Sequence, residues 1–258
     1  MMLPYRVVPV PMFDDNYLWL LIAANGDTIA VDVGDYEVLR NYLQAHSLTL
    51  TTVLITHHHR DHTAGLPELK KHHPDIPIYG STTISGVTHN LHGGDVLTIP
   101  SFGKILVLDV AGHTKVLLAF YHLSEKILFC SDVIFSAGCG RIFDGDATSF
   151  YHSLQKISLL ADDTRLCPAH EYTLSNLDFA LAVEPDNIHS QQYQQACQNL
   201  RNHNQATLPT LLGHEKKINP YLRCHLLKQR ISEFTQEDCP TGASAFAALR
   251  RYKNTWVG

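Results

Sequence analysis

The stretch that decides the fold is LITHHHRDHTAGL, residues 54–66. Four histidines and an aspartate fall within six consecutive positions there, directly after an aliphatic and β-branched run at 51–56 that predicts a buried strand. Side chains alternate between the two faces of a strand, so His57 and His59 face one side and His58 faces the other. The pattern therefore predicts two imidazoles placed to share one metal ion, with a non-ligating histidine between them.

Asp61 and His62 follow where the chain turns into the next helix, so we expect them to point to a neighbouring position. A single catalytic zinc ion usually takes three protein ligands and a water, and this stretch alone offers four. The alternative is a surface histidine tract that binds metal adventitiously. The acidic residue within the cluster and the strand-to-loop context favour a site for two adjacent metal ions.

Further polar residues stand at the ends of later predicted strands. They are His113 after the strand at 105–110, Asp132 at the end of 126–132, and His170 at the end of 164–170. Each alone is typical of an ordinary turn or surface residue. Taken together, they lie where chain reversals at one edge of a sheet would gather them, and binding residues are often found on such connections.

Outward from this stretch, the first two-thirds of the chain alternates short β-rich runs with helical patterns, which predicts a mixed α/β domain. The predicted strands lie at 5–10, 17–24, 28–33, 51–56, 105–110, 116–122, 126–132 and 164–170, and an Asn-Gly-Asp sequence at 25–27 predicts a hairpin turn. Helical periodicity predicts helices at 35–47, 63–73 and 147–161.

The strand signal stops after His170. Leucines at 174, 177 and 181 share one helix face, as do the apolar residues at 193, 196, 197 and 200. A further amphipathic helix is predicted at 241–253, with Thr241 as its N-cap. We therefore expect a metal-binding catalytic domain at 1–170 and a small, all-helical substrate-binding domain at 171–258.

The composition is that of an ordinary soluble globular protein, with 45% hydrophobic and 17% charged residues in a chain of 258. The net charge of −5 argues against nucleic acid as a partner. No segment approaches the roughly 18 apolar residues of a membrane helix, and the N-terminus lacks the features of a signal peptide. The six cysteines include no Cys-x-x-Cys pair, so we expect reduced thiols and a cytoplasmic location.

The His-x-His-x-Asp-His pattern, followed by AGHT at 111–114, a strand-end aspartate and a later histidine, resembles the metallo-β-lactamase superfamily. Within it, the chain is most similar to the hydroxyacylglutathione hydrolases (glyoxalase II). The segments that carry this similarity are 13–21, 56–65, 111–114, 135–145, 170–173, 218–223 and 249–253. The resemblance implies an αββα sandwich of the metallo-β-lactamase type followed by a helical domain.

The resemblance also implies a ligand set for two divalent ions. His57, His59 and His113 would hold one ion, Asp61, His62 and His170 the other, and Asp132 would bridge them. Asp61 and Asp132 would be the catalytic residues, acting with a metal-bridging hydroxide as nucleophile. We expect zinc, although histidine and carboxylate ligands also suit iron or manganese. The sequence departs from the family at two positions, Ser131 and Ala169, where relatives usually have glycine.

For the substrate, the resemblance implies a glutathione thioester, and specifically the cleavage of S-D-lactoylglutathione to D-lactate and glutathione in methylglyoxal degradation. Arg141, Arg250 and Lys253 would recognise the glutathione moiety, and Tyr172 would hydrogen-bond its peptide backbone. Phe143 stands where many relatives have a tyrosine, so that hydroxyl is lost. We expect a monomer without nucleic-acid or membrane partners.

Two alternatives remain open at this point. A glutathione persulfide dioxygenase with a mononuclear iron would share the fold, although the complete second set of ligands argues against it. A non-catalytic metal-binding module is the other, and the substrate-binding residues near the C-terminus argue against that. A covalent mechanism is disfavoured because the chain has no Gly-x-Ser-x-Gly sequence and Cys139 has no neighbouring histidine in the sequence.

Overall fold

The computed structural model describes residues 5–256. Contacts divide these residues into two compact units. The first comprises residues 5–109 and 116–129, and the second comprises 110–115 and 130–256. Both contain strands and helices, so the predicted mixed α/β class is confirmed. The domain boundary expected at residue 170 stays a prediction.

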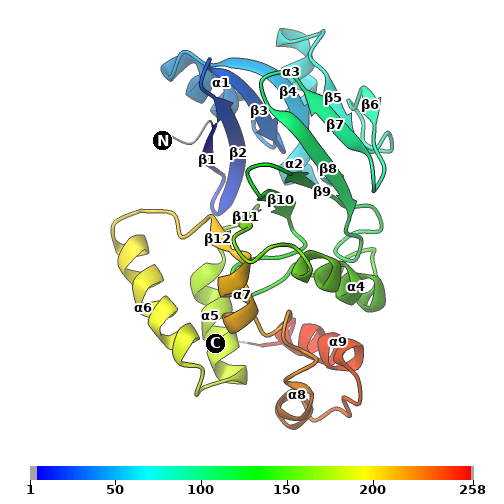
Figure 1. Cartoon of the computed structure of the whole chain (residues 1–258), viewed down its shortest axis with the longest axis vertical. Coiled ribbons are helices and arrows are strands. Elements are labelled where there is room, and N and C mark those ends of the chain that lie inside the picture. The colour runs from blue at the N-terminus through cyan, green and yellow to red at the C-terminus, as the bar shows by residue number, and fades with distance from the viewer. Residues whose placement is uncertain (1–4, 257–258) are drawn as a thin grey trace. The chain divides into compact units, whose positions relative to one another are not determined.

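The first unit contains a six-stranded mixed sheet, shown in blue to cyan in Figure 1. Along the sheet its strands are β1 (Tyr5–Met12), β2 (Asn16–Ala23), β3 (Asp27–Val31), β4 (Thr49–Leu54), β5 (Ile78–Gly80) and β6 (His89–Asn90). β1, β2 and β3 pair antiparallel, whereas β3 to β6 pair parallel. Gly26 forms the predicted hairpin turn with a φ of 87°, a conformation that glycine adopts without a steric penalty.

Helix α1 (Tyr36–Ala45) connects β3 to β4 and explains why these two strands can pair parallel. Asp35 caps its N-terminus by accepting hydrogen bonds from the amides of Glu37 and Val38. Its buried side chains, Tyr36, Leu39 and Leu43, recur with the helical period. They join a core cluster with one face of the sheet, in which β2 contributes Leu18, Leu20 and Ile22.

The helix predicted at 63–73 is wrong in its extent. The structure has a short helix α2 (Arg60–Thr63) and a separate helix α3 (Leu66–His72). Pro67 stands in the first turn of α3, where its missing amide hydrogen costs no helical hydrogen bond. The break leaves Asp61 and His62 inside the one-turn α2, directly after the extended histidines.

The second sheet is also six-stranded within the described residues. Its strands, in order along the sheet, are β12 (Thr210–Leu211), β11 (Arg165–Pro168), β10 (Ile127–Ser131), β9 (Leu118–His122), β8 (Gly103–Asp109) and β7 (Val96–Ile99). The four predicted strands from 105 to 170 correspond to β8 to β11. The short strands β5, β6 and β7 carry too little periodicity to have been predicted. The expectation that no strand follows His170 is wrong, because β12 pairs with β11.

Helices are the main regular structure of the second unit. They are α4 (Ala147–Ser158), α5 (Thr173–Val183), α6 (Ile188–Asn202), α7 (Leu212–Ile218), α8 (Lys228–Thr235) and α9 (Gly242–Lys253). α9 packs against α4 and α8, as the red and green ribbons of Figure 1 show, and α5 packs against α6. Thr241 caps α9 in a reciprocal capping box with Ser244, which confirms the predicted N-cap. Among residues 5–256, no helix is long and apolar enough to cross a membrane.

Candidate metal centre and substrate-binding residues

The histidine stretch lies just beyond β4, and its side chains alternate as the extended pattern predicts. His57 is buried, His58 is exposed and His59 is half-buried. The ring centroids of His57 and His59 are 4.6 Å apart. The Nδ1 atom of His57 lies 3.1 Å from the hydroxyl of Thr56, which holds the ring from one side.

Asp61 and His62 are held by two residues that the sequence interpretation missed. The Nδ1 of His62 lies 2.8 Å from the carboxylate of Asp32, which is itself buried and accepts from the amide and hydroxyl of Thr56. Asn16 donates its side-chain amide to Oδ2 of Asp61 at 2.9 Å. Asp32 follows β3 in the segment VDVGD, so its place after a buried strand was the signal that could have identified it.

His113, Asp132 and His170 meet in the second unit. Nε2 of His113 lies 3.2 Å from Oδ2 of Asp132, and Nε2 of His170 lies 3.5 Å from Oδ1 of the same carboxylate. All three side chains are buried. Gly140 packs so closely beside them that a Cβ there would meet the carbonyl oxygen of Asp132 at 2.0 Å. The expectation that strand ends bring these three residues together is therefore met.

Ser131 and Ala169, the two positions where relatives usually have glycine, differ in their backbone conformation. Ser131, directly before Asp132, has a φ of 47°. This left-handed conformation costs a residue with a Cβ roughly 1–2 kcal/mol and explains why glycine suits the position. Ala169 has a negative φ and donates its amide to the carbonyl of Ser131 at 3.3 Å. The serine therefore carries the strain, and the alanine does not.

The hydrogen bonds determine which ring nitrogen faces each carboxylate. His113 donates from Nδ1 to the carbonyl of Arg141 at 2.6 Å, because a carbonyl can only accept. A neutral imidazole then turns the lone pair of Nε2 toward Asp132. His62 repeats the arrangement: Nδ1 faces the Asp32 carboxylate, and Nε2 lies 3.3 Å from Asp61. A proton on Nε2 or a metal ion between the two atoms satisfies such a contact, and metal-binding histidines commonly have their second nitrogen bonded in this way.

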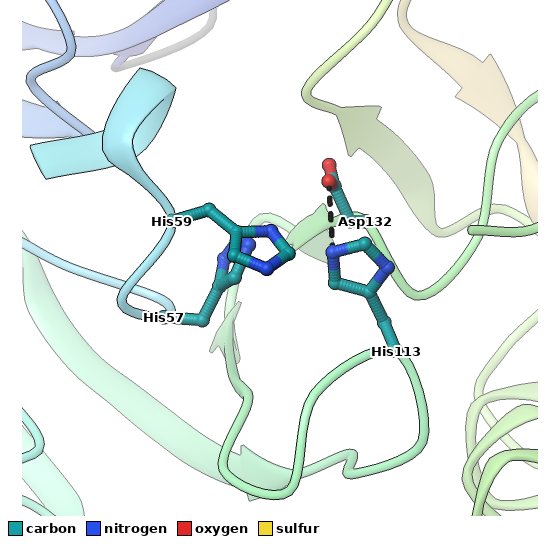
Figure 2. A group of neighbouring side chains, drawn as sticks. All are labelled: His57, His59, His113 and Asp132. Carbon is teal, nitrogen blue, oxygen red and sulfur yellow. Dashed lines mark ion pairs between the residues drawn. The ribbon is translucent and has the colours of Figure 1, made fainter. Parts of the chain in front are cut away.

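The potential ligand atoms fall into two groups, each with all of its atoms within 4.8 Å of one another. Figure 2 shows the first group, His57, His59, His113 and Asp132. The second comprises Asp61, His62 and His170. His58 belongs to neither group. Histidine nitrogens with carboxylate oxygens are a ligand set suited to a divalent transition metal, so the donor chemistry fits metal binding.

Three of the expected substrate-binding residues lie beside these histidines in the second unit. Tyr172 stacks on His170 with a centroid separation of 4.7 Å and an interplanar angle of 5°. Phe143 is 61% exposed, and its ring centroid lies 5.2 Å from that of His113 with an interplanar angle of 81°. The Arg141 side chain is exposed. Each imidazole therefore has an aromatic ring beside it, Phe143 next to His113 and Tyr172 next to His170.

Arg250 and Lys253 on α9, which the family resemblance implies for glutathione recognition, are more enclosed than the charge of their side chains suggests. Arg250 is only 7% exposed, and its guanidinium donates to the carbonyls of Cys139 and Gly140 at 3.1 and 3.4 Å. The ammonium of Lys253 lies 4.5 Å from the ring centroids of both Phe179 and Trp256, within the range of a cation–π interaction. Both cations are thus held in defined positions before any ligand binds.

The chain is similar to known proteins over nearly its whole length. Residues 14–170 match the metallo-beta-lactamase superfamily, and residues 171–256 match the hydroxyacylglutathione hydrolase C-terminus. A hydroxyacylglutathione hydrolase of Aliivibrio salmonicida is 44% identical, covering 95% of this chain and 97% of the relative. One from Photobacterium profundum is 40% identical, covering 97% and 99%. The chain belongs to the hydroxyacylglutathione hydrolase family.

A solved structure similar to this hydrolase is that of ETHE1 from Myxococcus xanthus. It has a TM-score of 0.65 and 22% identity, covering 97% of this chain and 98% of that one. At that identity the similarity concerns the fold alone. Together with the superfamily match, it confirms the predicted metallo-β-lactamase-like α/β sandwich with a helical C-terminal region.

The alternation at 57–59 leads to a test with a matched control. We propose that His59 binds metal and His58 does not. His59→Ala should lose at least one metal equivalent after dialysis, because a nitrogen ligand is removed, whereas His58→Ala should keep the wild-type content. Inductively coupled plasma mass spectrometry measures both. Equal metal loss in the two variants would contradict the assignment.

Proposed function

We propose that this protein hydrolyses the thioester bond of S-(2-hydroxyacyl)glutathione, taking S-D-lactoylglutathione to D-lactate and glutathione with two divalent metal ions. The curated relatives that align with almost the whole chain are named hydroxyacylglutathione hydrolases, which are thioester hydrolases. Two histidine–carboxylate contacts carry the proposal, His113–Asp132 and His62–Asp61. In each of them Nε2 of the imidazole faces a carboxylate oxygen, as two ligands of one metal ion would.

The proposed metal ligands follow the two groups of neighbouring donors. His57, His59, His113 and Asp132 would hold one ion, and Asp61, His62 and His170 the other. Asp132 would contribute to the second ion as well, since its Oδ1 lies 3.5 Å from Nε2 of His170. Zinc is the ion we expect, since the mixed imidazole and carboxylate set suits it. When bound to these residues, such ions would lower the pKa of a water molecule and would stabilise negative charge that develops on the carbonyl oxygen of the substrate.

The chain's own residues keep this set in order. Asp32 holds His62 through Nδ1, and the carbonyl of Arg141 holds His113 in the same way. The Asn16 amide orients the carboxylate of Asp61, which we propose as a catalytic residue together with Asp132 because both would orient the attacking water. The leaving group is the cysteine thiol of glutathione, which has a pKa of about 8.5. It therefore departs as a thiolate with little need for a general acid.

Substrate recognition is proposed to lie in the second unit. Glutathione carries two carboxylates, which guanidinium and ammonium groups bind well. Arg141, Arg250 and Lys253 provide these cations. Tyr172, which stacks on His170, would hydrogen-bond the peptide backbone of the substrate, and Phe143 would contribute an apolar ring without a hydroxyl.

The same proposal extends to the setting of the enzyme. We propose methylglyoxal degradation as its process, with the cytoplasm as its location and the monomer as its working state. All six cysteines are buried free thiols, as expected for a reducing compartment. The persulfide dioxygenase and the non-catalytic module are not favoured, because the named relatives and the C-terminal family match are those of the hydrolase.

The direct test is thiol release from S-D-lactoylglutathione, followed with a chromogenic thiol reagent on zinc-loaded protein. We expect turnover that tracks metal occupancy and approaches its maximum near two zinc ions per chain. Asp61→Asn should lower kcat by at least about 100-fold, because it removes a charged oxygen ligand. His58→Ala serves as the control and should retain activity. An absence of thiol release from fully loaded protein would sink the proposal.

Lys253 should give substrate capture a distinctive pH dependence. Burial, with the neighbouring Arg250 guanidinium, lowers the pKa of Lys253 to about 8, although Asp178 on α5 and Cys139 oppose the shift. The protonated form below this pH binds a carboxylate, and the neutral form above it does not. We therefore expect kcat/KM, which reports the free enzyme, to fall as the pH rises through about 8.

Lys253→Arg provides the control for this effect, because a guanidinium keeps its charge throughout the range. Its kcat/KM should show no fall near pH 8, whatever its absolute value. If the fall persists unchanged in the arginine variant, another group is responsible for it.

A further inference from the structure

The loop at residues 135–141 has most of its backbone oxygens bonded by side chains from the C-terminal helical region. Asn219 donates its amide to the carbonyls of Phe135 and Gly138 at 3.0 and 2.9 Å. Asn176 on α5 donates to the carbonyl of Ser136 at 3.2 Å. Arg250 on α9 bonds the next two carbonyls, as described above. The conformation of the loop is therefore fixed by hydrogen bonds from side chains that are distant in the sequence, rather than by regular secondary structure of its own.

Glu215 accepts hydrogen bonds both from this loop and from residues of the helical region. Its carboxylate, on α7, is fully buried. It accepts hydrogen bonds from the hydroxyl of Ser136 and from the backbone amide of Ala137, both at 2.7 Å. It also accepts from Thr210 at 2.9 Å and from Asn219 at 3.3 Å. A buried carboxylate with this many donors is held firmly, because each unmatched donor would leave a polar group without a partner.

The far end of the same loop reaches the imidazole of His113. The carbonyl of Arg141 accepts from Nδ1 of His113, and this bond sets which nitrogen faces Asp132. Gly140 leaves no room for adjustment, since a Cβ there would already overlap the carbonyl of Asp132. A displacement of the loop therefore moves the acceptor that orients His113.

We propose that Glu215 is a positioning residue that, through the loop at 135–141, sets the orientation of His113 and thereby the metal affinity of the site. The inference rests on the proposed function, because it takes His113 as a metal ligand. The helical region then has a second task besides contacting substrate: its side chains hold part of the metal centre in shape. Partners that orient metal-binding histidines typically contribute about 10–100-fold to metal affinity or activity.

Glu215→Gln tests this proposal with little change in volume. The variant loses the negative charge and one acceptor oxygen, so the hydroxyls of Ser136 and Thr210 must turn from donors to acceptors or lose their bonds to residue 215. Glu184→Gln is the matched control. Glu184 is also a buried glutamate of the helical region, 8% exposed, and it bonds Arg223 and Asn187 instead of the loop. Both variants should lower the melting temperature.

The deciding readout is zinc affinity, measured by competition with a chromogenic chelator. We expect Glu215→Gln to weaken zinc binding by about 10-fold or more and to lower kcat while KM changes by less than about 2-fold. Glu184→Gln should bind zinc like the wild type. Ser136→Ala, which removes a single bond to Glu215, should weaken zinc binding in the same direction by a smaller factor, and it keeps the test available should Glu215→Gln fail to fold.

Wild-type zinc affinity in both Glu215→Gln and Ser136→Ala would overturn the proposal and leave Glu215 a purely structural residue. So would equal weakening in Glu184→Gln, which would mean that any loss of stability reduces metal binding. A wild-type protein that binds zinc but releases no thiol would instead refute the proposed function, and the zinc comparison would still decide the role of Glu215.

Discussion

The proposed chemistry depends on the fixed orientation of two imidazole rings. His62 and His113 each commit Nδ1 to a protein oxygen, so Nε2 of each ring faces a carboxylate. In water such a ring would rotate and exchange partners freely. In a buried setting the rotation is prevented by the hydrogen bond, and the lone pair has a defined direction before any ion arrives. Without these two hydrogen bonds, the lone pairs of His62 and His113 would not be directed toward a common metal position with the aspartates.

The strand positions explain how residues so far apart in the sequence supply this centre. An extended chain leaving β4 places His57 and His59 on one side, and a one-turn helix then carries Asp61 and His62. Asp132 directly follows β10, and its neighbour Ser131 holds the left-handed conformation that redirects the chain. The strain at Ser131 is kept at the point where the backbone must turn, as is common at functional sites.

Much of this was predictable from sequence because the responsible rules are local. The alternation at 57–59, the hairpin at Gly26 and the cap at Thr241 each depend on a few consecutive residues. The single helix predicted at 63–73 was wrong. Apolar periodicity continues across Gly65 and Pro67, but these two residues mark the start of a separate helix. The role of Glu215 could not be assigned by pattern, since its partners in the loop, Ser136 and Ala137, lie 79 and 78 residues away in the chain. Asp32 offered one signal, its place after a buried strand, but its partners Thr56 and His62 lie 24 and 30 residues away. Only the family resemblance distinguishes Arg250 from an ordinary basic residue at a helix end, and its burial could not be predicted from the sequence.

The central claim is that two metal ions share the carboxylate of Asp132. Anomalous X-ray diffraction at the zinc absorption edge, from crystals grown with zinc, tests this most directly. We expect two anomalous peaks, one beside His57, His59 and His113 and one beside Asp61, His62 and His170, with Asp132 in contact with both. A single peak at full zinc loading, or a second peak away from Asp132, would contradict it.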